Sequence, residues 1–266
     1  MLPTVTLVPC KDQNFLLLDT NDLISRQLKY VGVWEEHLLI ISKFLIETIP
    51  QPLVLDIGAN IGAYCVPLAK EIGLRGGSII AYEPQRIVFY QLCGNIFVNS
   101  LDNIYALNRA LGDESGVVEI PENNYSTSEN IGAFSISKEF RQRNGVEASM
   151  QDKTQLIPIC KLDDENFNKE IDLIKIDVEG SELQVLRGAT KLLKINNFPP
   201  ILFEAWSFEW FATSKIELLE FLKNLGYEVT NISSDDYIAQ HPLNKIKVNF
   251  SYGKEGVIHF VRALPK

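Results

Sequence analysis

Residues 53–62 form the segment that most constrains the fold of this chain. A buried apolar run, Leu53–Leu55, is followed by Asp56 and by a turn that contains Gly58 and Gly62, and a second apolar stretch begins there. The first run predicts a buried strand, and the second stretch predicts a helix. Such a strand–turn–helix unit brings backbone amides close to a nucleotide-like ligand at a helix N-terminus.

The spacing of the glycines discriminates between possible ligands. A dinucleotide fingerprint has the pattern G-x-G-x-x-G. Counted from Gly58, the other two glycines would fall where Asn60 and Ala63 stand. Asp56 beside the turn would repel a pyrophosphate, but it suits a ligand with an ammonium or sulfonium group, such as S-adenosylmethionine. The alternative is an ordinary tight turn in an α/β core.

Strand and helix patterns alternate along most of the chain after residue 50. This alternation predicts an α/β fold with a mostly parallel, doubly wound sheet. The expected strands cover residues 53–57, 78–82, 104–110, 171–177, 200–205, 227–232 and 256–263. The expected helices cover residues 62–72, 85–99, 182–194 and 214–224.

Residues 1–50 precede this alternation. They show a strand-pair pattern over 4–19 and apolar positions at helical spacing over 34–48. We therefore predict that residues 1–50 form a strand pair and a helix packed on a main domain of residues 51–266.

The alternation is interrupted between about residues 112 and 160. This stretch is rich in Asn, Ser, Glu and Gln, and it contains two short strand candidates, 116–120 and 155–160. It is too long for a plain connection between a strand and a helix. Two interpretations stay open: an insert that acts as a lid or recognises the substrate, and a disordered excursion at the surface.

The overall composition excludes several kinds of partner. The chain has 266 residues, 46% of them hydrophobic, and a net charge of −9, which argues against nucleic acid or an anionic membrane as its main partner. The most apolar stretch, Leu38–Ile46, is too short to span a bilayer. The N-terminal segment lacks the features of a signal peptide, so a cytoplasmic location is expected. The cysteines are widely spaced and are expected to be reduced thiols: Cys10, Cys65, Cys93 and Cys160.

Glu83 follows the second expected strand, about 25 residues after Gly58. In open α/β sheets ligands bind outside the carboxyl ends of the strands, and an acidic residue at this distance can accept both hydroxyls of a ribose. A nicotinamide cofactor would use the same position. The structural alternative is that Glu83 caps the next helix, which Pro84 could open.

A second acidic group follows the strand at 171–177. Asp177 and Glu179 are two residues apart, so an extended backbone places both side chains on one face. Two such carboxylates repel one another unless a sulfonium, an ammonium or a metal ion lies between them; otherwise one has a raised pKa and can act as a general base. Ser181 and Gln184 fit a capping box for the next helix, and Glu182 suits its first turn.

Two further acidic residues are candidates for the site. Glu204 ends the strand at 200–205, where it could bind an acceptor or share a metal, and aromatic residues follow it over 206–211. These rings could stack on an acceptor or cover the following helix. Glu35, after Trp34, could fold over a cofactor. The three histidines are isolated and are expected to be structural: His37, His241 and His259.

Four of these segments occur in the order found in a known family. They are Gly32-Val33-Trp34-Glu35, Leu55-Asp56-Ile57-Gly58-Ala59-Asn60-Ile61-Gly62, Tyr82-Glu83-Pro84 and Ile176-Asp177-Val178-Glu179-Gly180-Ser181-Glu182. Over residues 32–206 the chain resembles the FkbM family of S-adenosylmethionine-dependent methyltransferases. The resemblance implies a Rossmann-like class I methyltransferase fold, whose last strand is antiparallel, and methyl transfer to oxygen.

The same resemblance implies roles for individual residues. The methionine part of S-adenosylmethionine would be held by Asp56, Gly58, Asn60 and Gly62, and the ribose by Glu83. The strand end at Arg109 and Ala110 would face the adenine. Related methyltransferases often have an acidic residue near that point, whereas this chain has Arg109. Backbone groups or Asp113 would therefore make the adenine contact here. Asp177 would line the methyl-transfer centre.

The reaction expected from this resemblance is in-line methyl transfer to a hydroxyl of a sugar, polyketide or related small molecule. Asp177 or Glu179 is the candidate base, with Glu204 nearby. A divalent metal held by these three carboxylates is a less favoured alternative, because no histidine joins them. The rival functions are an NAD-dependent oxidoreductase and a catalytically idle binding protein of the same fold. The oligomeric state does not follow from the sequence.

Overall fold

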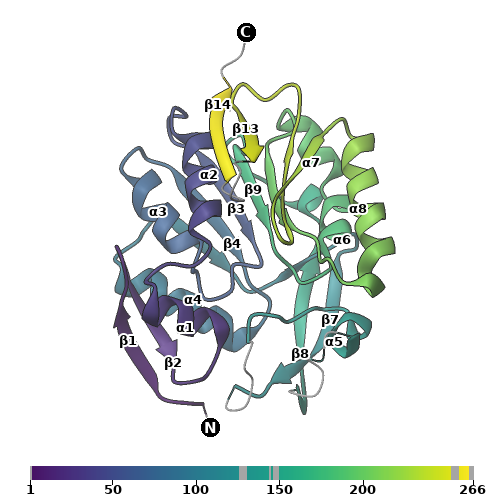
Figure 1. Ribbon diagram of the computed structural model, residues 1–266. Helices are drawn as coiled ribbons and strands as arrows, with labels where there is room; N and C mark the ends of the chain where they lie inside the picture. The colour runs from purple at the N-terminus through teal and green to yellow at the C-terminus, as the bar shows by residue number, and fades with distance from the viewer. Residues whose placement is uncertain (1, 126–130, 144, 146–149, 253–257, 264–266) are drawn as a thin grey trace.

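A seven-stranded sheet forms the centre of the computed structural model, which describes residues 2–125, 131–143, 145, 150–252 and 258–263 (Figure 1). Its strands are β3 (Leu53–Ile57), β4 (Ser78–Tyr82), β5 (Ile104–Leu107), β9 (Leu173–Ile176), β10 (Ile201–Glu204), β11 (Glu228–Ser233) and β12 (Asp236–Gln240). They lie in the order β11-β12-β10-β9-β3-β4-β5. The strands β10, β9, β3, β4 and β5 run parallel to one another, and β12 is antiparallel to both β10 and β11. The mostly parallel sheet with an antiparallel last strand confirms the predicted fold class.

The identity of the antiparallel strand differs from the prediction. Residues 256–263 were expected to form it, but β14 (Ile258–Ala263) pairs with β13 (Lys247–Tyr252) in a separate two-stranded sheet. Residues 256 and 257 lie outside the described residues. The strand that enters the central sheet is β12, which follows β11 after a short turn. The local pattern of 256–263 predicts a strand correctly, but it carries no information about the pairing partner.

The strands bury both of their faces against helices. Consecutive residues of β3 alternate between two hydrophobic clusters: Val54 belongs to one, and Leu53 and Leu55 belong to the other. The first cluster includes side chains of α2 (Glu36–Ile46), α3 (Cys65–Gly73) and α4 (Arg86–Val98). The second includes side chains of α6 (Glu182–Arg187), α7 (Thr190–Ile195) and α8 (Ala212–Asn224). Burial on both faces explains why the strands read as continuous apolar runs.

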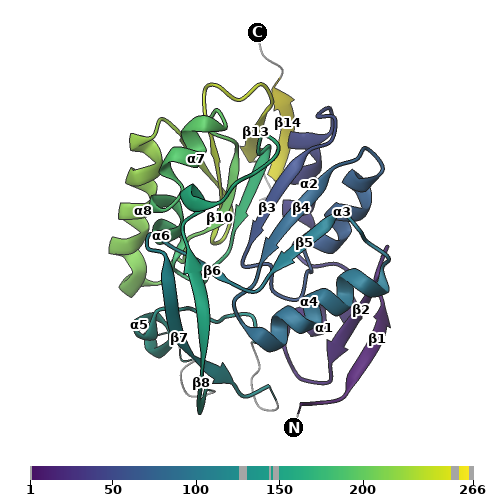
Figure 2. The same cartoon turned by 180° about the vertical axis from the view of Figure 1, so that it is seen from behind.

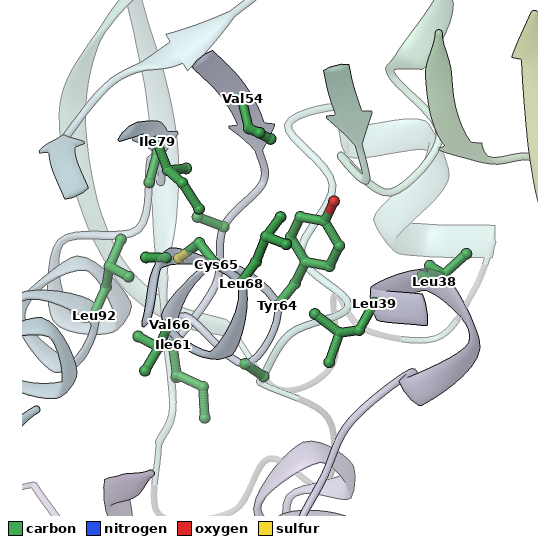
Figure 3. Close-up of a cluster of buried hydrophobic side chains, with 14 of the residues drawn as sticks. Leu38, Leu39, Val54, Ile61, Tyr64, Cys65, Val66, Leu68, Ile79 and Leu92 are labelled. Atoms are coloured by element: carbon green, nitrogen blue, oxygen red, sulfur yellow. The ribbon is translucent and has the colours of Figure 1, made fainter. Parts of the chain in front are cut away.

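Figure 3 shows the first cluster, in which side chains of β3 and β4 meet the helices on that face. Val54 and Ile79 come from the sheet, and Leu92 comes from α4. The segment from Ile61 to Leu68 packs between them, so the start of α3 is held against the sheet directly after the glycine turn. The other labelled members are Leu38, Leu39, Ile61, Tyr64, Cys65, Val66 and Leu68.

The predicted helix over 182–194 is divided in two. The structure has α6 and α7, with Gly188 and Ala189 between them. A Cβ atom at Gly188 would lie 1.9 Å from the Gly112 carbonyl oxygen, so the chain of the insert passes directly against this break. The apolar pattern runs through both helices and gives no sign of this contact.

The N-terminal residues pack beside α4. The predicted strand pair is present as β1 (Val5–Pro9) and β2 (Asn14–Leu18), and the helix predicted over 34–48 is α2. A further helix, α1 (Leu23–Tyr30), was not predicted; the Asp22 side chain caps it by accepting a hydrogen bond from the Ser25 N–H. The α4 side chains of Asn95 and Gln91 bond the backbone of Leu16. The proposed division at residue 50 stays a prediction.

The described part of the insert is ordered. Both strand candidates are present within β7 (Gly116–Asn123) and β8 (Met150–Cys160), which pair antiparallel, and β6 (Ala110–Leu111) joins β8 (Figure 2). A short helix, α5 (Lys138–Arg143), lies between β7 and β8 in the chain, and single-turn helices follow at Leu162–Asp164 and Glu209–Phe211. Residues 126–130, 144 and 146–149 of the insert lie outside the described residues. Within the described ranges no helix has the length and apolarity required to cross a bilayer.

Candidate active site

The glycine turn after β3 holds the ends of three strands together. The backbone N–H groups of Gly58 and Ala59 both donate to the Tyr82 carbonyl, at 3.0 and 2.9 Å, and the Asp177 N–H donates to the Ile57 carbonyl at 2.9 Å. Gly58 has a φ of +82°, and a Cβ atom there would lie 1.7 Å from the Asp177 carbonyl oxygen. Only glycine fits this approach of two backbones.

A cavity of about 250 Å³ lies at the carboxyl ends of these strands. Most residues predicted for the site line it, although they come from six separate segments. They are Glu35, Gly58, Asn60, Glu83, Arg109, Ala110, Asp177, Glu179 and Glu204. The cavity therefore extends from the glycine turn to the acidic residues after β9 and β10.

Two predicted cofactor residues lie outside the lining of this cavity. Asp56 is fully buried beneath it, and neither carboxylate oxygen has a hydrogen-bond partner among the described residues. Burial raises the pKa of Asp56 to about 6, although the charge of Lys175 lowers it in part. Gly62 faces α4 instead, where a Cβ atom would lie 2.8 Å from the Leu92 side chain. Both residues support the glycine turn without lining the cavity.

The buried Glu83 carboxyl group is tied to the turn and to the start of α4. Its Oε2 accepts a hydrogen bond from the Asn60 N–H at 2.9 Å, and its Oε1 accepts one from the Gln85 N–H at 2.8 Å. Burial raises the pKa of Glu83 to about 8, although these two hydrogen bonds oppose the shift. Each oxygen keeps a second lone pair that can face a ligand.

Three carboxylates meet at the other end of the cavity. Asp177, Glu179 and Glu204 each place one oxygen so that all three oxygens lie within 4.8 Å of one another. Burial and the neighbouring carboxylates raise the pKa values of Glu179 and Glu204 well above the usual range. The Trp206 indole N–H donates to Glu204 Oε2 at 2.8 Å. The parallel pairing of β9 with β10 brings Asp177 and Glu204 together.

Lys175 provides a positive charge beside these carboxylates. Its Nζ donates to Asp177 Oδ2 at 2.9 Å and lies 5.4 Å from the centroid of the Tyr64 ring. Burial lowers the pKa of Lys175, but the charges of Asp177, Glu35 and Asp56 outweigh this effect and raise it. No motif in the sequence marks Lys175 as a site residue. A lysine inside a strand that is otherwise apolar was the signal available.

Glu35 reaches the cavity from the residue before α2. Its backbone is left-handed, with a φ of +44°, which is uncommon for a residue other than glycine. Its Oε2 is shielded from solvent and has no hydrogen-bond partner within the described part of the chain. Burial raises the pKa of Glu35 to about 7, while Lys175 opposes the shift.

Glu182 has a structural role that replaces the predicted capping box. Ser181 makes no side-chain capping bond to α6. Instead Glu182 Oε1 accepts hydrogen bonds from the N–H groups of Val178 and Gly180, at 3.1 and 3.2 Å. Glu182 therefore holds the turn that carries Glu179, whose φ is +55°.

The part of the cavity expected to face adenine is lined by Arg109 and Ala110. Arg109 Nη1 pairs with Glu165 Oε1 at 2.7 Å, so its charge is balanced by a residue that follows the insert. Asp113 is exposed and does not line the cavity. Asp113 is therefore not placed to contact a ligand in this cavity, and an adenine contact at the backbone of Arg109 and Ala110 stays a prediction.

The remaining lining residues were not predicted individually, although one of the two interpretations of the insert expected it to contact a substrate. Leu23 and Ile24 of α1 line the cavity, as do Gly132, Phe134 and Ile136 of the insert. No motif marks these residues, because they meet the site only through tertiary packing.

Aromatic residues after β10 pack on the insert helix. Phe140 of α5 contacts Trp206, Trp210 and Phe211, with ring centroids 6.2, 5.9 and 5.5 Å apart. None of these three rings lines the cavity. The structure places these rings outside the cavity and against α5 of the insert; cover of the following helix stays a prediction.

The carboxylates that line the cavity favour a ligand that carries positive charge. Its carboxylates would repel a pyrophosphate, whereas a sulfonium and an ammonium suit them. The Rossmann-like sheet with an antiparallel strand, the glycine turn and this acidic cavity together define a class I S-adenosylmethionine-dependent methyltransferase fold. The Methyltransferase FkbM domain model matches residues 56–229, and the chain belongs to the FkbM methyltransferase family.

Individual relatives are distant. The chain is 25% identical over 186 residues to methyltransferase sdnD of Sordaria araneosa, covering 62% of this chain and 69% of that protein. It is 26% identical over 146 residues to methyltransferase 1 of Beauveria bassiana (strain ARSEF 2860), covering 51% of this chain and 57% of that protein. The crystal structure of methyltransferase FkbM from Methylobacillus flagellatus KT is 20% identical, with a TM-score of 0.45, covering 71% of this chain and 43% of that one.

Proposed function

We propose that this protein transfers a methyl group from S-adenosylmethionine to a hydroxyl oxygen of a small molecule, such as a sugar or a polyketide. The observation that carries the proposal is one cavity that joins two kinds of group. The glycine turn and Glu83 line one part of it, and the carboxylates Asp177, Glu179 and Glu204 line another. Membership of the FkbM family supports the same reaction class.

The first part of the cavity would hold the cofactor. Gly58 and Asn60 would contact the methionine part, Glu83 the ribose, and the backbone at Arg109 and Ala110 the adenine. The S-adenosylmethionine, when bound, supplies a methyl group on a sulfonium that is already electrophilic. Asp56 and Gly62 would contribute indirectly, by setting the charge beneath the turn and its packing on α4.

The acidic part of the cavity would orient and deprotonate the acceptor. The main task of the protein is to hold the acceptor oxygen about 3 Å from the methyl carbon and in line with it. Asp177 or Glu179 would take the hydroxyl proton, and Glu204 would bind the acceptor. A carboxylate with a raised pKa is a stronger base, and the pKa of Glu179 is raised by its burial and its acidic neighbours.

The two rival functions make different predictions. An NAD-dependent oxidoreductase would require a site for a pyrophosphate, and the acidic cavity and the missing glycines oppose this. A catalytically idle binding protein would bind the cofactor without turnover. The presence of Asp56, Glu83 and Asp177 together favours a working site over an idle one, and a transfer assay decides between the two.

Thermal unfolding with S-adenosylhomocysteine, the reaction product, tests the cofactor. A ligand at ~100 times its dissociation constant adds about 2.7 kcal/mol of stability. We expect the melting temperature to rise with S-adenosylhomocysteine and not with NAD. Glu83→Gln should weaken the binding of S-adenosylhomocysteine by about tenfold or more. A Gln side chain keeps only one acceptor oxygen, and its NH₂ group would face a backbone N–H, so two donors would meet. Glu122→Gln, which changes an ion pair with Arg86 outside the cavity, is the matched control.

A transfer assay with labelled S-adenosylmethionine and a panel of polyhydroxylated acceptors tests the reaction. Asp177→Asn should retain the product-induced thermal shift and lose most of the transfer. A thermal shift with NAD, or no shift with S-adenosylhomocysteine, would reject the proposal. Product binding without transfer to any hydroxyl compound would favour the idle binding protein.

A further inference from the structure

Part of the cavity lining is apolar. Phe134 and Ile136 line the cavity from the insert, and Leu23 and Ile24 line it from α1. None of these four side chains contains a polar atom, whereas the strand ends contribute carboxylates to the same cavity. We call residues 131–136 the insert wall.

The backbone of the insert wall has several of its polar groups engaged. The Ile131 N–H donates to Asp22 Oδ1 at 3.0 Å. The Arg141 guanidinium donates from Nη1 to the carbonyls of Ser135 and Ile136, at 2.8 and 2.9 Å. Neither Asp22 nor Arg141 lines the cavity. These hydrogen bonds direct polar groups of the wall to partners outside the cavity, so the wall offers a ligand mainly hydrocarbon.

The insert wall extends between the two parts of the cavity. The carbonyl of its first residue accepts a hydrogen bond from Gln85 Nε2 at 3.3 Å, and the Gln85 N–H donates to Glu83, the residue proposed to hold the ribose. At the other end of the wall, α5 begins two residues after Ile136. Phe140 of α5 packs closely on the turn after β9, because a Cβ atom at Gly180 would lie 2.7 Å from the Phe140 ring. The wall therefore reaches from the cofactor part of the cavity to the acidic part, where the acceptor hydroxyl is expected.

A free sugar is a poor match to this wall. A sugar ring carries hydroxyls on most of its carbons, and a hydroxyl that is buried without a hydrogen-bond partner is costly. Hydroxyls that faced Phe134 and Ile136 would find no donor or acceptor on those side chains. Hydrocarbon in the same place would instead be removed from water, which is favourable.

The apolar lining continues to the surface at Leu23. This side chain lines the cavity and is 42% exposed, whereas its neighbour Ile24 is buried. An acceptor too large for the cavity could therefore extend its apolar portion over Leu23 without leaving an apolar surface.

We propose that the acceptor is amphipathic, with hydrocarbon beside the hydroxyl that receives the methyl group, and that Phe134, Ile136 and Leu23 select it against a free sugar. The proposal rests on the proposed function, because it describes the acceptor of that reaction. It narrows the acceptor to molecules with an apolar portion, such as a polyketide or a glycoside of an apolar alcohol. Phe134 and Ile136 are then residues that determine specificity without taking part in the chemistry.

Calorimetric titration of the full-length protein with methyl, butyl and hexyl β-D-glucoside, in the presence of saturating S-adenosylhomocysteine, tests the proposal. The three probes share one sugar and differ only in the length of the alkyl chain. We expect affinity to increase with chain length, and hexyl glucoside to bind at least about tenfold more tightly than methyl glucoside, because each buried methylene adds to the affinity. Equal affinities, or no binding of hexyl glucoside, would overturn the proposal.

Two variants locate the effect. Ile136→Thr keeps a β-branched side chain and places a hydroxyl in the wall, so the preference for hexyl over methyl glucoside should fall about threefold or more. Val118→Thr is the matched control, because Val118 packs in the same small cluster as Ile136 but does not line the cavity. An equal loss of preference in both variants would assign the effect to packing of the insert and overturn the proposal.

The thermal shift with S-adenosylhomocysteine separates this proposal from the proposed function. Ile136→Thr should leave that shift unchanged, and a loss of the shift in this variant would assign the wall to the cofactor instead of the acceptor. A normal shift with equal affinities for the three glucosides would reject the apolar wall alone. Absence of the shift in the unaltered protein would reject the proposed function and this proposal with it.

Discussion

Lys175 Nζ lies 2.9 Å from Asp177 Oδ2, and the lysine side chain is 6% exposed. The two residues are two positions apart at the end of β9, and Lys175 is paired in register with Asp56 of β3. One buried cation is thereby placed between the fully buried Asp56 and the acidic part of the cavity. It partly balances a cluster of carboxylates that would otherwise repel one another.

Lys175→Met should therefore destabilise the protein by about 3 kcal/mol, because removal of one partner leaves buried negative charge uncompensated. The loss should be greater at pH 8 than at pH 6, where part of the acidic cluster is protonated. Urea unfolding at both pH values measures this, with the exposed Lys194→Met as control. An equal loss at both pH values would indicate a packing effect instead of an electrostatic one.

Gly58→Ala should cost at least ~2 kcal/mol of stability, from a left-handed backbone and a steric overlap with the Asp177 carbonyl. Relaxation of that overlap would move β9 away from β3, so binding of S-adenosylhomocysteine should weaken too. Gly116→Ala in β7 is the matched control, because a Cβ atom there meets nothing within 4 Å. Urea unfolding and calorimetry measure the two effects; a Gly58→Ala protein as stable as the control would contradict the close approach.

The stability of the ligand-free protein should fall as the pH rises from about 5.5 to 8.5. Burial raises the pKa values of Asp56 to about 6, of Glu35 and Glu182 to about 7, and of Glu83 to about 8. A carboxyl group with a higher pKa in the folded state binds more protons when folded, so the free energy of unfolding decreases between the unfolded and the folded pKa. Melting temperatures across this range measure the slope. Glu83→Gln should flatten its upper part, and a rising curve would show that these groups are not buried as described.

The His37–Asp236 pair should add a small contribution with the same sign. His37 Nε2 lies 2.8 Å from Asp236 Oδ2, and this hydrogen bond raises the pKa of His37 despite partial burial. The contribution is full below the unfolded pKa of histidine and is lost as the pH rises through the folded pKa. Because both side chains are partly exposed, His37→Ala should cost less than ~1 kcal/mol at pH 5.5 and almost nothing at pH 8.5. Equal costs at the two pH values in urea unfolding would assign the effect to packing.

Arg141 should determine the conformation of the insert wall. Its buried guanidinium donates from Nη1 to the carbonyls of Ser135 and Ile136 and lies over the Phe134 ring. Because Phe134 and Ile136 line the cavity, Arg141→Met should cost about 2 kcal/mol and speed proteolysis within the insert. Arg143→Met, two residues later and more exposed, should do neither. Limited proteolysis of both variants measures the difference, and equal cleavage rates would refute the role of Arg141.

The strands and most helices could be predicted because burial on both faces of a parallel sheet requires continuous runs of apolar residues, which are visible in the local sequence. The strand at 53–57 matches β3, and the helix at 85–99 matches α4 within a residue at each end. The position of β12 in the sheet is not visible in the local sequence, since its pairing with β10 depends on the whole sheet. The helix α1 was missed for another reason: it has eight residues, fewer than the window of about 11–18 residues over which a helical period can be recognised.

The sequence by itself determined the strand–turn–helix unit and the placement of Glu83 and Asp177 at strand ends, because these follow from local patterns and from the rule that parallel strands end at one edge. Tertiary structure alone decided which carboxyl groups meet. Alternation assigns Asp56 to a face of β3, but only the packing of α2, α3 and Lys175 over that face buries it beneath the cavity. Glu35 reaches the cavity because α2 begins there, and Glu204 lies beside Asp177 because β10 pairs with β9. These contacts join segments far apart in the chain, and no local pattern encodes them.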